Sequence, residues 1–148
     1  MTGKTLGNLG NIYQHIGQFE NAIEHYKKSI EIGKQIGNTR SVCIHLGNLG
    51  NLYQTLGQHG NAVTQYEQSL KISRELGSRQ AEGHTLGNLA RAFAFLKQYT
   101  KAIALFTEAI DITVQLKMRR QEVYFLGYLG EVYLRLERYA EAKQILQK

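Results

Sequence analysis

The eight residues LGNLGNIY at 6–13 return as LGNLGNLY at 46–53, as LGNLARAF at 86–93 and as LGYLGEVY at 126–133. The step between copies is forty residues throughout. Other columns keep the same step, for example alanine at positions 22, 62, 102 and 142. Because self-similarity at a fixed period marks a repeat architecture, each unit is predicted to be one copied structural module.

Each unit contains two apolar series with helical spacing, separated by a short break. In the first unit the series that predicts the first helix is Leu6, Leu9, Tyr13 and Ile16. The series that predicts the second helix is Ala22, Ile23, Tyr26, Ile30 and Ile36. Steps of three and four residues line one side of a helix. Every unit should therefore form a helix A and a helix B.

The predicted helices end at residues that tolerate a left-handed turn. Gly17 and Gly57 follow helix A, and Gly37 and Gly77 follow helix B. The third unit departs from this pattern, with Lys97 and Lys117 at these positions. Glycine is the common residue there because it enters the left-handed conformation without a steric penalty.

The sequence predicts an all-α fold of eight helices, since it has no proline and no alternating strand pattern. A lone helix pair cannot bury both apolar stripes, so the pairs are expected to stack into an α-α superhelix. The four expected repeats cover about residues 2–38, 39–78, 79–118 and 119–148, the last one truncated. Because no polar capping helix follows, we expect a fragment of a longer protein.

Composition excludes several classes of protein. Apolar residues make up 43% of the 148 residues, charged residues 20%, and the net charge is +6. No apolar run approaches membrane-spanning length, and Met1–Gly10 lacks the layout of a secretory signal, so a cytoplasmic protein is expected. Cys43 is alone, which predicts a packing residue. The five histidines form no metal or catalytic motif, so neither a cofactor, a metal site nor an enzymatic activity is expected.

The repeat resembles the tetratricopeptide repeat (TPR). The matching residues in the first unit are Leu6, Leu9, Gly10, Tyr13, Ala22, Tyr26 and Ser29. The common form of this repeat has about 34 residues, and the longer variant here is similar to Pins-type regulators, kinesin light chains and bacterial signalling proteins. The resemblance implies a protein-binding scaffold in which asparagines of the inner, concave helices hold an extended peptide.

A second, polar stripe follows helix A in each unit. Its members are Lys4, Asn8, Asn11 and His15; Ile44, Asn48, Asn51 and Thr55; His84, Asn88, Arg91 and Phe95; and Tyr124, Tyr128, Glu131 and Arg135. An amide side chain can both donate to and accept from a peptide unit. We therefore expect an asparagine ladder formed by Asn8, Asn48 and Asn88, flanked by Asn11 and Asn51, to bind a peptide backbone.

The same stripe carries positive charge and aromatic rings. Lys4, His84, Arg91 and Arg135 could pair with carboxylates, so an acidic peptide is the expected partner. Tyr128 could contact an apolar side chain, whereas Phe95 and Tyr124 are expected to be buried against neighbouring helices. Four glycines beside the ladder are interpreted as space for the backbone of the ligand, namely Gly7, Gly47, Gly87 and Gly127.

Two other functions stay open at this point. The net charge and the run Lys117-Met118-Arg119-Arg120 are compatible with a nucleic-acid-binding helical repeat. The run is also expected to end helix B, where cations oppose the helix dipole. A module that oligomerises through exposed terminal helices is the third possibility.

Overall fold

The computed structural model describes residues 2–136 and 144–147, and over these residues the regular structure is helical. The chain divides into two compact units, Met1–Gly77 and Ser78–Lys148. The first unit contains α1 (Gly3–His15), α2 (Phe19–Ile36), α3 (Thr39–Thr55) and α4 (His59–Glu75). The second contains α5 (Arg79–Phe95), α6 (Tyr99–Gln115) and α7 (Arg119–Arg135). The predicted eighth helix falls mainly on residues 137–143, outside the described part.

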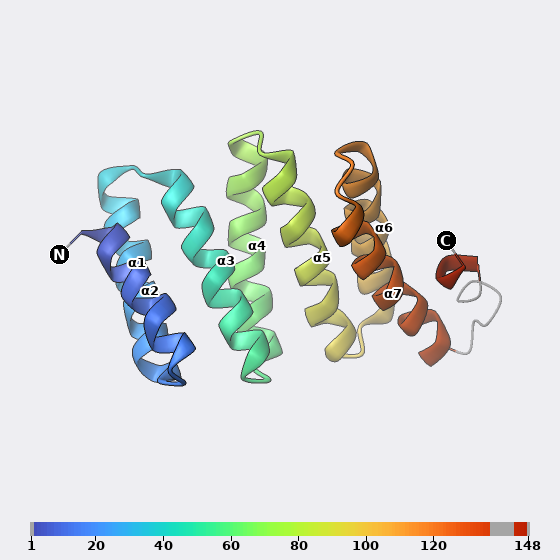
Figure 1. Cartoon of the computed structure of the whole chain (residues 1–148), viewed down its shortest axis with the longest axis horizontal. Helices are drawn as coiled ribbons and strands as arrows, with labels where there is room; N and C mark the ends of the chain where they lie inside the picture. The colour runs from blue at the N-terminus through green and yellow to red at the C-terminus, as the bar shows by residue number, and fades with distance from the viewer. Residues whose placement is uncertain (1, 137–143, 148) are drawn as a thin grey trace. The chain divides into compact units, whose positions relative to one another are not determined.

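Successive helices within each unit run antiparallel and pack side by side (Figure 1). In the first unit α1 packs on α2, α2 on α3 and α3 on α4; in the second, α5 packs on α6 and α6 on α7. The odd-numbered helices are the predicted helices A, and the even-numbered ones are helices B. Helix A and helix B of each pair are joined by a tight turn of about three residues.

All six turns between the described helices contain one residue with positive φ. Four of them are glycines, with φ of 79° at Gly17, 73° at Gly37, 75° at Gly57 and 68° at Gly77. Lys97 and Lys117 adopt the same conformation, with φ of 61° and 57°. The turn geometry is therefore kept even where the sequence departs from glycine, and both lysines bear the steric cost of the left-handed region.

The helix pairs are held by the predicted motif residues. Ala22, Ala62 and Ala102 are fully buried, and so is the ring of Tyr26, one helical turn after Ala22. A Cβ atom on Gly10 would lie 2.8 Å from the ring of Tyr26, so glycine is required for this close approach. Cys43 is buried in the same way, as expected for a packing residue.

One part of the predicted apolar pattern is wrong. Ile16, expected on the packing side of helix A, is 60% exposed, and Ile36 at the end of helix B is 70% exposed. Both residues lie in the last turn or cap of their helix, next to the left-handed residue. The chain reverses there, so no neighbouring helix reaches far enough to cover them.

Candidate functional site

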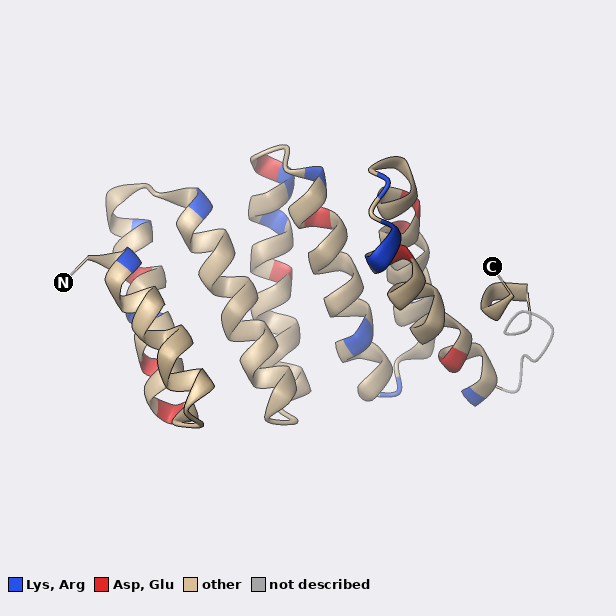
Figure 2. Ribbon diagram, viewed as in Figure 1, with Lys and Arg blue, Asp and Glu red and all other residues tan. Residues whose placement is uncertain are grey.

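The predicted polar stripe is accessible to solvent on both helices A of the first unit. Asn8, Asn11 and Lys4 are exposed on α1, and Asn51 is exposed on α3, while Asn48 is half-buried. Charged residues are sparse along α1 and α3 (Figure 2). This face therefore offers mainly amide groups.

Two of the predicted ligand-binding asparagines also hold their own helix pair together. The Tyr26 hydroxyl donates a hydrogen bond of 2.5 Å to Oδ1 of Asn11. Forty residues later, the Tyr66 hydroxyl donates one of 2.6 Å to Oδ1 of Asn51. The third unit has Phe106, which lacks a hydroxyl, and Arg91 replaces the asparagine. Asparagine therefore occurs at this position of helix A where helix B supplies a tyrosine hydroxyl, and it is replaced where helix B has phenylalanine.

Gly7 and Gly87 have a different role from the one expected. A Cβ atom on Gly7 would lie 2.0 Å from Nε2 of His45, and one on Gly87 would lie 2.1 Å from Cζ of Phe125. The space beside each glycine is occupied by a ring from the next helix A, so it is not open to a ligand backbone. These glycines serve packing between α1 and α3 and between α5 and α7.

His45 occupies its space with defined hydrogen bonds. Ser29 Oγ donates to the carbonyl oxygen of Gly3 at 2.6 Å, so the 3.0 Å contact between Ser29 Oγ and His45 requires Nδ1–H of the histidine to donate. Burial lowers the pKa of His45 below its ordinary value, and a hydrogen bond to the backbone of Ser41 partly opposes this. The neutral ring is therefore favoured.

The second unit concentrates charge and aromatic rings between α5 and α7. The Arg91 guanidinium carbon lies 4.7 Å from the ring centroid of Tyr128 and 5.7 Å from that of Tyr124. The two tyrosine hydroxyls are 3.2 Å apart and their rings meet edge to face at 4.9 Å. Tyr128 also stacks parallel to Phe106 at 6.2 Å. Cation–π attraction thus fixes the position of the guanidinium.

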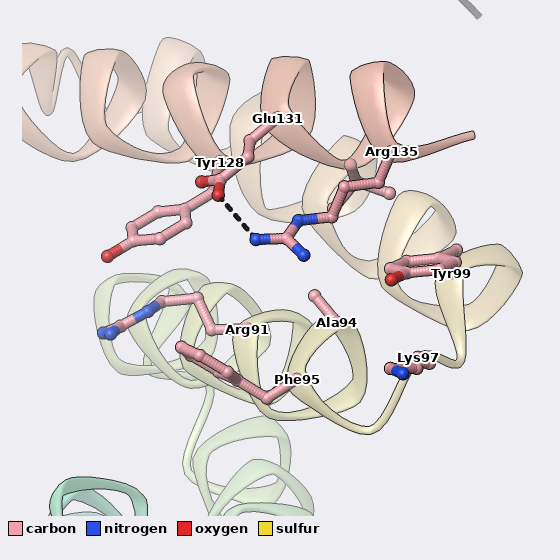
Figure 3. Close-up of a pocket in the computed structure, with 9 residues that line it drawn as sticks. Arg91, Ala94, Phe95, Lys97, Tyr99, Tyr128, Glu131 and Arg135 are labelled. Atoms are coloured by element: carbon pink, nitrogen blue, oxygen red, sulfur yellow. Dashed lines mark hydrogen bonds and ion pairs between the residues drawn. The ribbon is translucent and has the colours of Figure 1, made fainter. Parts of the chain in front are cut away.

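Two pockets flank this cluster. One is lined by residues of α5 and α7, namely His84, Asn88, Arg120, Gln121, Tyr124 and Phe125. The other includes the turn to α6 and is lined by Arg91, Ala94, Phe95, Lys97, Tyr99, Tyr128, Glu131, Val132 and Arg135 (Figure 3). Five of the predicted site residues, His84, Asn88, Arg91, Tyr128 and Arg135, line these pockets. The second unit therefore brings together all the site residues predicted in that part of the chain.

The pockets carry an excess of positive groups. In the second pocket, Arg135 Nη2 donates to Oε1 of Glu131 at 3.1 Å, and this bond raises the pKa of the guanidinium. Burial raises the pKa of the Tyr128 hydroxyl, and the hydrogen bond with Tyr124 acts in the same direction. Burial lowers the pKa of His84. The raised pKa keeps Tyr128 protonated at neutral pH, so Arg91 lies against a neutral ring.

Sequence reasoning missed several residues of this site. Phe95 and Tyr124 were expected to be buried but are 56% and 49% exposed. The reason is that Phe125, rather than Tyr124, is the ring that enters the space beside Gly87. The sequence marks Lys97 only as a lysine at a turn position where the first two units have glycine. This departure was the one sign in the sequence that Lys97 could belong to a site.

The basic run at 117–120 was also placed wrongly. Helix α6 ends at Gln115, and Arg119 is the first residue of α7. The cations therefore lie at a helix N-terminus, where the dipole does not favour them. Arg119 compensates by pairing with Glu122 at 2.8 Å.

Two further findings concern the described residues. No cluster of three or more side chains that could hold a metal ion occurs among them, and none of their helices is long and apolar enough to cross a membrane.

Comparisons with known proteins agree with this architecture. Sequence models of the tetratricopeptide repeat match residues 1–75, 41–113 and 125–148. The structure of BtubC (BKLC) from P. vanneervenii superposes with a TM-score of 0.90 at 18% identity, covering 98% of this chain and 60% of that one. A comparison with curated proteins gave no match.

Two further structures are similar. A Rap protein complexed with competence and sporulation factor has a TM-score of 0.83 at 18% identity, with 97% of this chain and 40% of that one covered. The repeats of a putative kinesin light chain from Podospora anserina give 0.80 at 21% identity, covering 98% and 72%. The chain thus spans less than two thirds of the BtubC and Rap structures.

Antiparallel helix pairs with a solvent-exposed face on their first helices define a helical-repeat scaffold for protein–protein interaction. The chain belongs to the tetratricopeptide-repeat family, whose models match most of its length. The predicted all-α solenoid class is confirmed. The expected absence of catalysis stays a prediction.

Proposed function

We propose that this chain binds an extended, acidic segment of a partner protein on the solvent-exposed side of its helices A. The observation that carries the proposal is the state of Arg91. Its guanidinium lies against two aromatic rings, its Nε is buried without a hydrogen-bond partner, and no carboxylate of a described residue pairs with it. A buried donor that lacks a partner is costly, and a carboxylate that binds the same guanidinium would offset part of that cost.

Other cationic side chains line the two pockets that flank Arg91. Arg120 lines the first pocket, and Lys97 and Arg135 line the second. Glu131 is an acidic residue in the second pocket, and it is already paired with Arg135. The net charge of the residues that line these two pockets is therefore positive. Positive clefts attract acidic partners and raise their association rate at low ionic strength.

The asparagine ladder is the second part of the proposal. Asn8, Asn48 and Asn88 occupy equivalent positions on α1, α3 and α5, and Asn88 lines a pocket. Helices that pack side by side lie about 10 Å apart, which corresponds to about three residues of an extended chain. We propose that the amides of each unit hydrogen-bond to the backbone of a bound segment and that, in the second unit, Arg91 and its neighbours select its side chains.

The similar Rap structure, which holds competence and sporulation factor, supports partner binding by a scaffold of this fold. To test the proposal, a random peptide library is panned against the purified chain, and the affinity of the recovered peptides is measured by fluorescence anisotropy. Acidic sequences should be enriched. Arg91→Met should weaken their binding about tenfold or more, because a charged pair in a partly buried site is lost.

The matched control is Lys71→Met, which removes the same charge from an exposed position on α4. It should leave the affinity unchanged within about twofold, since isolated surface charges contribute little. Recovery of neutral or basic peptides, or equal losses in both variants, would contradict the proposal.

Nucleic-acid binding is the weaker alternative. Basic residues gather where α7 begins and in the turn before it (Figure 2), but Arg119 is paired with Glu122 there. Binding to RNA or DNA would show a steep loss of affinity with added salt. Self-association is the third candidate, and sedimentation across a concentration series would detect it.

A further inference from the structure

The two pockets between α5 and α7 are lined by equivalent positions of the same two helices, although the residue types differ. Nearly every lining position in the first pocket has a counterpart seven residues later in the second. The pairs are His84 and Arg91, Asn88 and Phe95, Gln121 and Tyr128, Tyr124 and Glu131, and Phe125 and Val132. Seven residues make about two helical turns, or about 10.5 Å. The pockets are therefore two turns apart on the same pair of helices.

Each pocket has room for one side chain. The first has a volume of about 240 Å³ and the second about 100 Å³. For comparison, a cavity of about 150 Å³ in a protein interior can hold benzene. The apolar residues that line the second pocket are Ala94 and Phe95 (Figure 3) and also Val132, and charged residues and tyrosines make up the rest of its lining. An aliphatic side chain fits the second pocket, and a side chain of that size or larger fits the first.

A charged group separates the two pockets. Arg91 and Tyr128 belong to the second pocket and Tyr124 to the first, and these three residues form the cation–π cluster. A ligand that fills both pockets has to pass over this cluster. Its intervening residues therefore face a guanidinium that has no carboxylate partner among the described residues.

Among extended conformations, the distance between the pockets favours one. In a polyproline II helix, side chains three positions apart point the same way and are separated by about 9.3 Å. In a β-strand, side chains on one face are about 6.6 Å or 13 Å apart. Of these two extended conformations, only the first has a spacing close to the distance between the pockets. An α-helical ligand would match that distance with side chains seven positions apart, but it is not the extended segment of the proposed function.

We propose that the α5–α7 groove binds a segment in the polyproline II conformation, with two apolar side chains three positions apart and a carboxylate between them that pairs with Arg91. This inference rests on the proposed function and specifies the partner class. The two pockets hold the apolar side chains, and the charge between them gives the acidic preference.

The test uses fluorescein-labelled peptides and the full chain of 148 residues. The central sequence Leu-Glu-Glu-Leu is symmetric, so the direction of binding need not be known. It is compared with Leu-Glu-Leu, with Leu-Glu-Glu-Glu-Leu, with a helical peptide whose leucines are seven positions apart, and with a peptide whose leucines are replaced by serine. The peptides with two-position and four-position spacing should bind about tenfold more weakly, because one leucine stays in water. The serine peptide should also bind more weakly, because neither pocket is filled, and so should the helical peptide, because the groove binds an extended segment.

A pocket-filling variant ties the effect to the site. Ala94→Phe should occupy the second pocket and abolish the advantage of the three-position spacing. Ala104→Phe, at an exposed position of α6, is the matched control and should keep it. Circular dichroism shows whether both variants keep the helical content of the parent.

The outcomes separate the two proposals. If all acidic peptides bind equally whatever their leucine spacing, this inference falls and the proposed function stands. If the helical peptide binds best, the polyproline conformation is wrong. If no acidic peptide binds at any spacing, the proposed function itself fails.

Discussion

The hydroxyl of Tyr26 donates a 2.5 Å hydrogen bond to Oδ1 of Asn11, which joins the solvent-exposed face of α1 to the buried face of α2. The same hydroxyl lies 3.0 Å from Oε1 of Gln14, so its single hydrogen has a second acceptor within reach. Burial raises the pKa of this phenol, which keeps it a donor. An asparagine expected to bind only a ligand thus also supports the helix pair.

Removal of this acceptor should destabilise the first unit. We expect Asn11→Ala to lower the free energy of unfolding by about 1 kcal/mol, because the phenol keeps only the longer bond to Gln14. Asn8→Ala, on the same exposed face, should change it by less than about 0.5 kcal/mol. Urea denaturation followed by circular dichroism measures both. Equal effects would show that the Tyr26 bond contributes nothing.

The two lysines in left-handed turns predict a gain in stability. Lys97→Gly and Lys117→Gly should each stabilise the second unit by about 0.5–1 kcal/mol, because glycine adopts positive φ without a steric penalty. The corresponding alanine variants should give no gain, since alanine meets the same penalty. Thermal denaturation of the four variants tests this.

The same pair of variants separates stability from binding. Lys97 lines the second pocket, whereas Lys117 does not line either pocket. Lys97→Gly should therefore weaken the acidic peptide severalfold while it stabilises the fold, and Lys117→Gly should only stabilise it. Weaker binding in both variants would point to a general effect of charge.

Replacement of glycine by alanine should change the stability in opposite directions at two equivalent positions of helix A. Gly87→Ala should destabilise the second unit by about 1–3 kcal/mol, because the new methyl group would overlap the Phe125 ring. Gly127→Ala introduces a methyl group with no atom within 4 Å, so it should stabilise α7 by about 0.5–1 kcal/mol. A loss of stability at both positions would contradict the packing role assigned to Gly87.

Stability should depend on pH through His45. Burial lowers its pKa in the folded chain, so the unfolded chain takes up the proton at higher pH. The contribution to stability is complete above the unfolded pKa of about 6.5 and is lost as the pH falls from there through the lower pKa of the folded chain. His45→Gln should flatten this part of the stability profile. His84→Gln should leave the pH dependence that His45 causes unchanged. It should remove only the similar pH dependence that His84 itself causes.

Much of the fold followed from local patterns. The period of the LGNLGNIY motif, the spacing of residues such as Ala22 and Tyr26, and the glycines in the turns were enough to predict helix pairs with nearly correct ends. Their success has a physical cause, because a repeat packs mainly against itself and its direct neighbours. Ile16 was misplaced because its apolar character says nothing about whether a neighbour reaches the end of the helix.

The sequence by itself determined the repeat, the all-helical class and the face of helix A on which Asn8, Asn48 and Asn88 lie, since these depend on spacing along one helix. Only the tertiary structure decided that Phe125 fills the space beside Gly87, that Tyr26 bonds to Asn11, and that Arg91 lies between two pockets. Each of these depends on side chains fifteen or more positions apart, and packing alone selects which of them meet.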